Sequence, residues 1–142
     1  MKNIYFCLSV SFILSLLFTV SGLLANNIYT SKDYFGWRDK LRQENPNDFK
    51  AAKFCKSLIG YNVTFESKVM NVNKNAEIMA DMDSGIMSLP DIMLTLKDKD
   101  QAEDLKNGHL IKYDGVISKC EYNSITSTLF LSVSSGALNL HY

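Results

Sequence analysis

Residues 98–117 (DKDQAEDLKNGHLIKYDGVI) constrain the fold most, because a short helical pattern leads there directly into a strand pattern. Asp98 is a residue type that caps helix starts, and Gly108 is typical of a helix end. Residues 110–117 are rich in strand-forming types, and Gly115 lies where a sheet can bend sharply. Further strand patterns lie before and after this stretch. Together these features predict a small closed barrel.

Residues 1–25 have the layout of a secretory signal peptide. Lys2 is the only charged residue, residues 4–20 are an almost unbroken apolar run, and small residues precede Asn26. Cleavage after Gly22 or after residue 25 fits this pattern, and an uncleaved membrane anchor is the alternative, since an apolar stretch of about 20 residues can span a bilayer. The signal predicts a periplasmic or secreted protein with no membrane contact after cleavage.

The exported chain keeps two cysteines. Cys7 leaves with the signal, so Cys55 and Cys120 remain. Because exported proteins rarely keep spare thiols, we predict a disulfide between them, closing a loop of 65 residues (120 minus 55). Two buried free thiols are the alternative.

Two amphipathic helices are predicted in residues 26–59. After a loose polar start, the first helix begins at Ser31 or Lys32 and ends before Pro46, which disfavours helix at the preceding residue. The second helix covers residues 46–58. Its lysines form a stripe that we interpret as a solvated face, the alternative being a site for an anionic partner: Lys50, Lys53 and Lys56.

From residue 60 to residue 142 the pattern is that of strands, in which side chains alternate between two faces. A long first strand starts at Tyr61, and its alternation slips at residues 67–70, which predicts a β-bulge. In the second strand, residues 76–82, Asp81 is expected to face outward. The remaining strands are predicted at residues 86–96 with a break at Pro90, at 110–120, and at 128–133, where residues 134–136 end the last strand. Residues 137–142 are interpreted as a short tail, with a return to the sheet as the alternative.

Three strands, a helix and two more strands is the order of the OB-fold. The chain is therefore predicted to be α+β, mainly β: a five-stranded OB-like Greek-key barrel with a helix at residues 100–106 between strands three and four, preceded by two N-terminal helices. Gly60-Tyr61-Asn62-Val63 and residues 108–117 resemble exported bacterial OB-fold proteins of the tRNA-anti-like kind. This resemblance covers residues 58–133 and implies a fold, not a catalytic signature.

The sequence contains no set of residues typical of an enzyme or a metal site. Asp81-Met82-Asp83-Ser84-Gly85 is similar to the opening of a calcium loop, but no Glu closes the loop, so we predict a hairpin turn. His109 and His141 supply too few ligands for a metal. We therefore expect no enzymatic activity, no catalytic residue, no metal and no cofactor.

Nucleic-acid binding by a barrel face needs exposed aromatic residues among basic ones. Here the candidate aromatics are predicted to point inward and the body after residue 57 is acidic: Tyr61, Phe65 and Tyr113. We thus predict an exported, non-enzymatic binding module of the cell envelope that contacts a protein partner through the barrel face or the N-terminal helices. The alternative is a small ligand or oligosaccharide bound in the barrel cleft.

Overall fold

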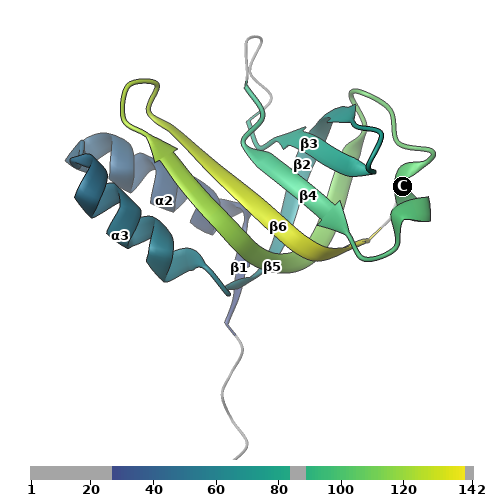
Figure 1. Ribbon diagram of the computed structural model, residues 1–142, viewed down its shortest axis with the longest axis horizontal. Helices are drawn as coiled ribbons and strands as arrows, with labels where there is room; N and C mark the ends of the chain where they lie inside the picture. Colours follow the sequence, from purple (N-terminus) through teal and green to yellow (C-terminus); the bar gives the residue numbers. More distant parts are fainter. Residues whose placement is uncertain (1–26, 84–88, 140–142) are drawn as a thin grey trace, which may run out of the picture.

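The computed structural model describes residues 27–83 and 89–139, which fold into an α+β, mainly β structure (Figure 1). The predicted signal at residues 1–25, part of the turn and strand predicted at residues 83–96, and His141 lie outside the described residues. The elements, in chain order, are β1 (Ile28–Thr30), α2 (Ser31–Glu44), α3 (Asp48–Leu58), β2 (Asn62–Val72), β3 (Glu77–Asp81), β4 (Ile92–Leu96), the 3₁₀ helix η1 (Lys99–Ala102), β5 (Leu110–Asn123) and β6 (Thr128–Leu138).

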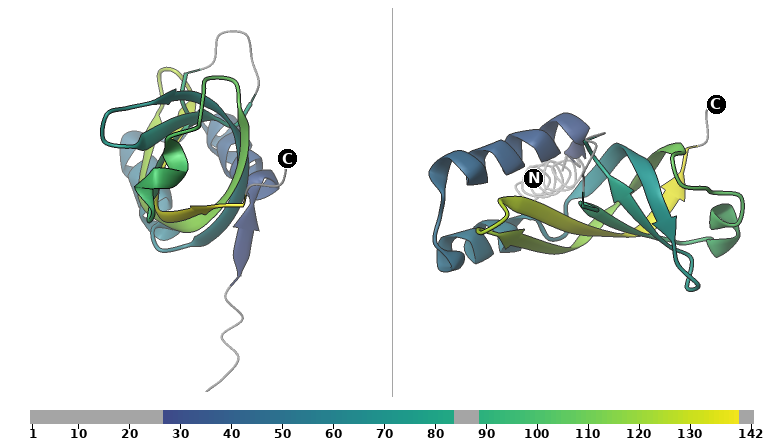
Figure 2. Two further views of the ribbon diagram at one scale, coloured as in Figure 1. Left: turned by 90° about the vertical axis from the view of Figure 1, so that its right-hand side faces the viewer. Right: turned by 90° about the horizontal axis from the view of Figure 1, so that it is seen from above.

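The strands form one sheet in which five strands close a ring. The order is β1-β2-β3-β4-β6-β5, and β5 pairs again with β2, so that β2, β3, β4, β6 and β5 return to their start. Figure 2, left, looks along this ring. Closure pairs the edges that an open sheet would expose.

The long strand β2 makes the closure possible because it serves two neighbours. Its first part pairs with β5, from Asn62↔Val116 to Lys68↔Leu110, and its last part pairs with β3. The register with β3 shifts between Val69 and Asn71. This shift confirms the bulge predicted near residues 67–70.

The core follows from alternation along the strands. Phe65, Ile78 and Tyr113 are fully buried inside the ring, as are the aliphatic residues of β4 and β6 that share their face. From the helices, Tyr34, Leu41, Cys55 and Leu58 join the same core. The N-terminal helices are therefore packed as part of the ring's own structure.

Gly115 lies at a point where two strands come unusually close. A Cβ at this position would overlap Cγ1 of Val133 and lie 3.0 Å from the carbonyl oxygen of Ser134. The β5–β6 register also shifts between Asp114 and Val116. Gly115 was predicted from the sequence as a place where the sheet can bend. In the structure, close packing against β6 accounts for a glycine at this position.

Both N-terminal helices occur at the predicted places. The Asp33 carboxylate accepts a hydrogen bond from the Thr30 N–H at 2.7 Å, which holds the start of α2. Asn45 takes a left-handed conformation, with φ 39°, directly before Pro46. The side chain of Asn47 then caps α3 by accepting a hydrogen bond from the Lys50 N–H.

Two predictions about local structure before residue 84 were wrong. Residues 28–30, expected to be loose, form β1, because β2 begins before β3 reaches it and its free edge accepts a parallel strand at Ile28↔Asn62. Tyr29 also stacks on Tyr61, with ring centroids 4.4 Å apart. Asp81, expected to face solvent, is 3% exposed; its carboxylate accepts a hydrogen bond from the Asp83 N–H at 3.0 Å and lies beside the carboxylates of Asp83 and Asp91.

Two further predictions, both about residues after 97, also differ from the structure. The helix predicted at residues 100–106 is the short 3₁₀ helix η1, because Ala102 is its only buried residue and one apolar contact cannot hold a longer helix. The last strand does not end at residues 134–136 but continues to Leu138. Gly136 lies against Leu94 in this continuation, and its carbonyl accepts a hydrogen bond from the Lys97 N–H.

Candidate functional site

The β5–β6 hairpin extends beyond the ring and is held by both helices. β5 pairs with β2 only as far as Val116, and from Lys119 to Asn123 it pairs with β6 alone. Figures 1 and 2 show α2 and α3 alongside this extension. We call α2, α3 and residues 119–132 the helix–hairpin unit.

A disulfide joins α3 to β5. Cys55 and Cys120 are bonded, with Cα atoms 5.1 Å apart, which confirms the predicted pair. Two helical turns away, the Ser124 hydroxyl donates a hydrogen bond to the Asp48 carboxylate at 3.3 Å. The helix is thus attached to the hairpin both within β5 and at its tip.

α2 holds the other strand of the hairpin through two backbone carbonyls. The Tyr34 hydroxyl donates to the Leu129 carbonyl at 2.9 Å, and Arg42 Nε donates to the Ser127 carbonyl at 3.0 Å. The Leu129 carbonyl lies on the edge of β6 that points away from β5, and Ser127 is the last residue of the hairpin turn before β6. The helix therefore satisfies acceptors that an unpaired strand edge would leave open.

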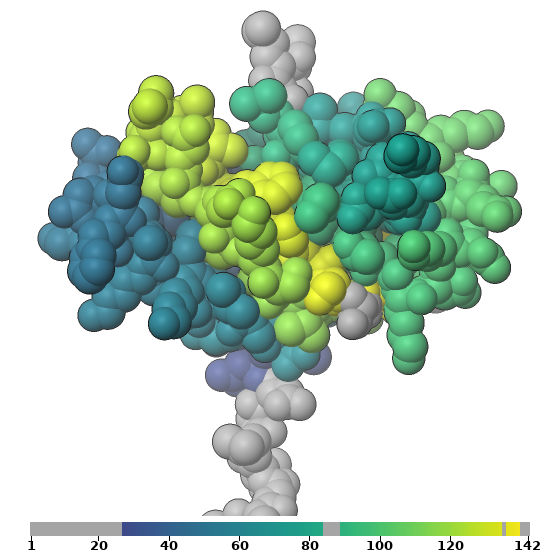
Figure 3. Space-filling view, viewed as in Figure 1, coloured from purple at the N-terminus to yellow at the C-terminus, as the bar shows by residue number. Residues whose placement is uncertain are grey.

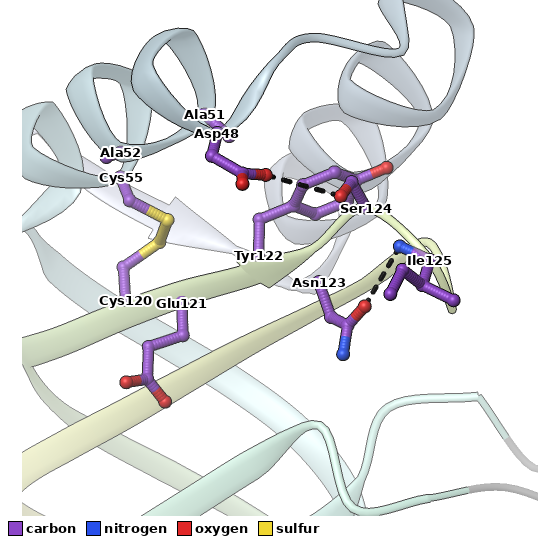
Figure 4. A pocket seen from close by; sticks show the side chains of 10 residues that line it. All are labelled: Asp48, Ala51, Ala52, Cys55, Cys120, Glu121, Tyr122, Asn123, Ser124 and Ile125. Atoms are coloured by element: carbon purple, nitrogen blue, oxygen red, sulfur yellow. Dashed lines mark hydrogen bonds between the residues drawn. A yellow bond between two sulfur atoms is a disulfide. The ribbon is translucent and has the colours of Figure 1, made fainter.

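A groove of about 580 Å³ lies between α3 and the hairpin. The disulfide is at one end and the Asp48–Ser124 contact at the other (Figure 4). The α3 wall is formed mainly by small side chains, and four consecutive residues of β5 form the opposite wall: Cys120, Glu121, Tyr122 and Asn123. Ile125, which is 93% exposed, stands at the rim.

The charges at the groove are mainly negative. Asp48 and Glu121 both line it, and Lys119, which does not line it, forms an ion pair with Glu121 at 2.9 Å. The predicted lysine stripe on α3 is exposed and Lys53, its central member, does not line the groove. The groove is thus suited to a partner that carries positive charge.

A second cluster of charged side chains lies beside α2. Carboxylate oxygens of Asp81, Asp83 and Asp91 lie within 4.8 Å of one another, and Arg38 pairs with Asp83. Three carboxylates of this kind can hold a cation, but here the Arg38 guanidinium already supplies positive charge to the cluster. Asp91 comes from the chain before β4 and not from the residues that a calcium loop would use.

Asp91 has an altered ionisation. The pKa of its carboxyl is raised to about 6, mainly because the group is buried. The charges of Asp83 and Asp81 also raise this pKa, whereas the hydrogen bond that the carboxylate accepts from the Met82 N–H lowers it. Asp91 is only 6% exposed. The calcium-like motif had marked Asp81 and Asp83 in the sequence, but no sequence signal pointed to Asp91 or Arg38, because only the tertiary fold brings these two residues to the cluster.

The other residues considered from sequence are not assembled into a site. His109 Nδ1 accepts a hydrogen bond from the Lys106 N–H at 3.3 Å. Phe65 and Tyr113 are buried as predicted, and Tyr61 is partly buried beneath Tyr29. Within the described residues no helix is long and apolar enough to span a lipid bilayer.

No known protein family, curated protein or solved structure matches this chain.

Proposed function

We propose that this protein is an exported, non-enzymatic binding module of OB-like fold, and that it contacts a protein partner. The observation that carries this proposal is the groove between α3 and the hairpin. It is long, open and bounded by two elements that are fastened together by a disulfide. A preformed surface of this kind favours an extended protein segment over a small enclosed ligand.

The pairing order of the ring supports the OB-like assignment. The ring order is β2-β3-β4-β6-β5, with β5 pairing back to β2. If β2 is counted as strand 1 of the ring, this order is 1-2-3-5-4-1. This is the strand order of a five-stranded Greek-key OB barrel. The bulge in β2 and the placement of η1 between the third and fourth ring strands add to the likeness.

The disulfide supports the proposed compartment. Structural disulfides persist in oxidising compartments and are rare in reducing ones. With the signal-like residues 1–25 before it, a Cys55–Cys120 bond is compatible with export. The proposed location is the periplasm or the exterior of the cell.

Cross-linking in the native cell envelope tests the proposal. The tagged, exported protein is cross-linked, purified and analysed by quantitative mass spectrometry against an unrelated tagged exported protein. We expect reproducible enrichment of a specific protein. Absence of enrichment, together with a thermal shift caused by a sugar or another small ligand, would instead support the alternative of a ligand in the barrel cleft.

A further inference from the structure

The groove runs along a strand edge whose backbone groups point into it. The Leu131 N–H donates to the Asp91 carbonyl at 2.8 Å, and the Leu129 carbonyl accepts from Tyr34. The N–H and C=O groups of Leu129 and Leu131 therefore point away from β5. In an antiparallel pair, two residues directly opposite each other either exchange backbone hydrogen bonds or both point these groups outward. Their partners on β5, Cys120 and Tyr122, must then turn their N–H and C=O groups away from β6.

This edge continues a strand pairing that already exists. The Ile117 N–H donates to the Tyr61 carbonyl at 3.0 Å, and the Ile117 carbonyl accepts from the Gly60 N–H at 2.8 Å. Upstream of Gly60 the chain forms α3, so β2 supplies no further partner. Among the described residues, no strand pairs with Cys120 or Tyr122 on this side.

The wall of α3 leaves room for side chains next to that edge. Ala51 and Ala52 lie between Asp48 and Cys55 on the helix face that lines the groove. In the space-filling view, α3 and the hairpin lie side by side on one face of the molecule (Figure 3). An unpaired strand edge beside a helix is the arrangement that accepts an extended peptide as an added strand.

We propose, resting on the proposed binding function, that an extended segment of a partner protein adds as a strand to the β5 edge at Cys120 and Tyr122. Its backbone pairs with these two residues, and a Lys or Arg side chain lies near Asp48 and Glu121. A second copy of this chain fits less well, because antiparallel pairing of two such edges would place like charges around Glu121 together. The partner segment is therefore basic, with apolar residues at alternate positions.

Selection from a display library of random short peptides, followed by residue-resolved amide exchange, tests this mode of binding on the exported protein with its disulfide intact. We expect selected peptides to alternate apolar and other residues and to include Lys or Arg. In the free protein the Cys120 and Tyr122 amides should exchange quickly, whereas the Glu121 and Asn123 amides, which face β6, should be protected. Bound peptide should slow exchange at Cys120 and Tyr122.

A matched pair of variants tests the position of the groove. Ala52→Trp places a large side chain in the groove, and Lys53→Trp places the same side chain on the exposed face of α3 outside it. We expect Ala52→Trp to weaken peptide binding by about tenfold or more and Lys53→Trp to leave it nearly unchanged. Thermal melting verifies that both variants fold. Should Ala52→Trp fail to fold, the exchange measurement on the unaltered protein still decides.

Three results would overturn the inference. The first is a library that yields no binder, and the second is a bound peptide that protects other amides or binds both Trp variants equally. The third is concentration-dependent protection of Cys120 and Tyr122 without peptide, which would assign the edge to a second copy of the chain. If the cross-linked envelope partner is captured equally by Ala52→Trp, the binding function stands and only strand addition fails. If the unaltered protein captures no partner, the proposed function itself fails.

Discussion

The ring and the helix–hairpin unit are held together in different ways. In the ring, every strand has a neighbour on each side, and the fully buried side chains share one core. In the helix–hairpin unit, apolar side chains of both helices join that same core, and single side-chain links also fasten the helices to the hairpin, namely the disulfide and the hydrogen bonds from Tyr34 and Arg42. The ring is thus closed by backbone pairing of every strand, whereas the unit relies on the shared core together with a few specific links between helix and hairpin.

The largest effect is expected from removing the disulfide. Replacing both Cys55 and Cys120 by Ala should lower the free energy of unfolding by about 4 kcal/mol, because the bond restricts a long loop in the unfolded chain. Denaturant unfolding of the protein with its disulfide formed, compared with the variant, measures this loss. The comparison of the two regions would be wrong if the loss were no greater than for an ordinary surface substitution.

The next effect concerns the ring. Gly115→Ala should lower the free energy of unfolding by roughly 2 kcal/mol, because the new Cβ overlaps Val133. Gly36→Ala in α2 is the matched control, since nothing lies within 4 Å of a Cβ there, and it should raise stability by about 0.5–1 kcal/mol. Melting temperatures that move in the same direction for both variants would refute the close approach of β5 and β6.

A pH-dependent effect is expected where α2 crosses the ring. Because the pKa of Asp91 is raised to about 6, its neutral form stabilises the fold. That contribution is complete below about pH 4, the ordinary value of the group, and is lost as pH rises through 6. Asp91→Asn removes this dependence, so the variant should gain about 1.4 kcal/mol or more over the unaltered protein at pH 7.5, one pKa unit being worth that amount.

Chemical denaturation at several pH values measures the Asp91→Asn effect. The difference between the variant and the unaltered protein should be largest above pH 7 and should shrink toward zero near pH 4. A difference that stays constant over this range would show that Asp91 does not titrate between these values.

The smallest effect is expected from a single hydrogen bond between α2 and the hairpin. Tyr34→Phe removes the hydroxyl that donates to the Leu129 carbonyl and should cost about 1 kcal/mol. Tyr122→Phe is its control, because the buried Tyr122 hydroxyl has no hydrogen-bond partner among the described residues, so its removal should be neutral or slightly stabilising. Equal losses in urea unfolding for the two variants would mean that Tyr34 does not act through this hydrogen bond.

Local features of this protein were determined by the sequence alone. The breaks at Pro46 and Gly60 limit the two helices, the slip in alternation locates the bulge in β2, and the presence of just two cysteines after residue 25 identifies the Cys55–Cys120 pair. Each of these depends on residues close together in the chain or on a choice with few possibilities. Such features can be predicted because their physical cause is local.

Pairing across the chain was decided only by the tertiary structure. Residues 28–30 have no strand pattern of their own and become β1 because β2 offers an open edge. Asp81 alternates outward yet is buried, since the fold brings the carboxylates of Asp83 and Asp91 beside it. The strand edge at Cys120 and Tyr122 is likewise invisible in the sequence, because alternation encodes which face a side chain takes but not which neighbour its backbone meets.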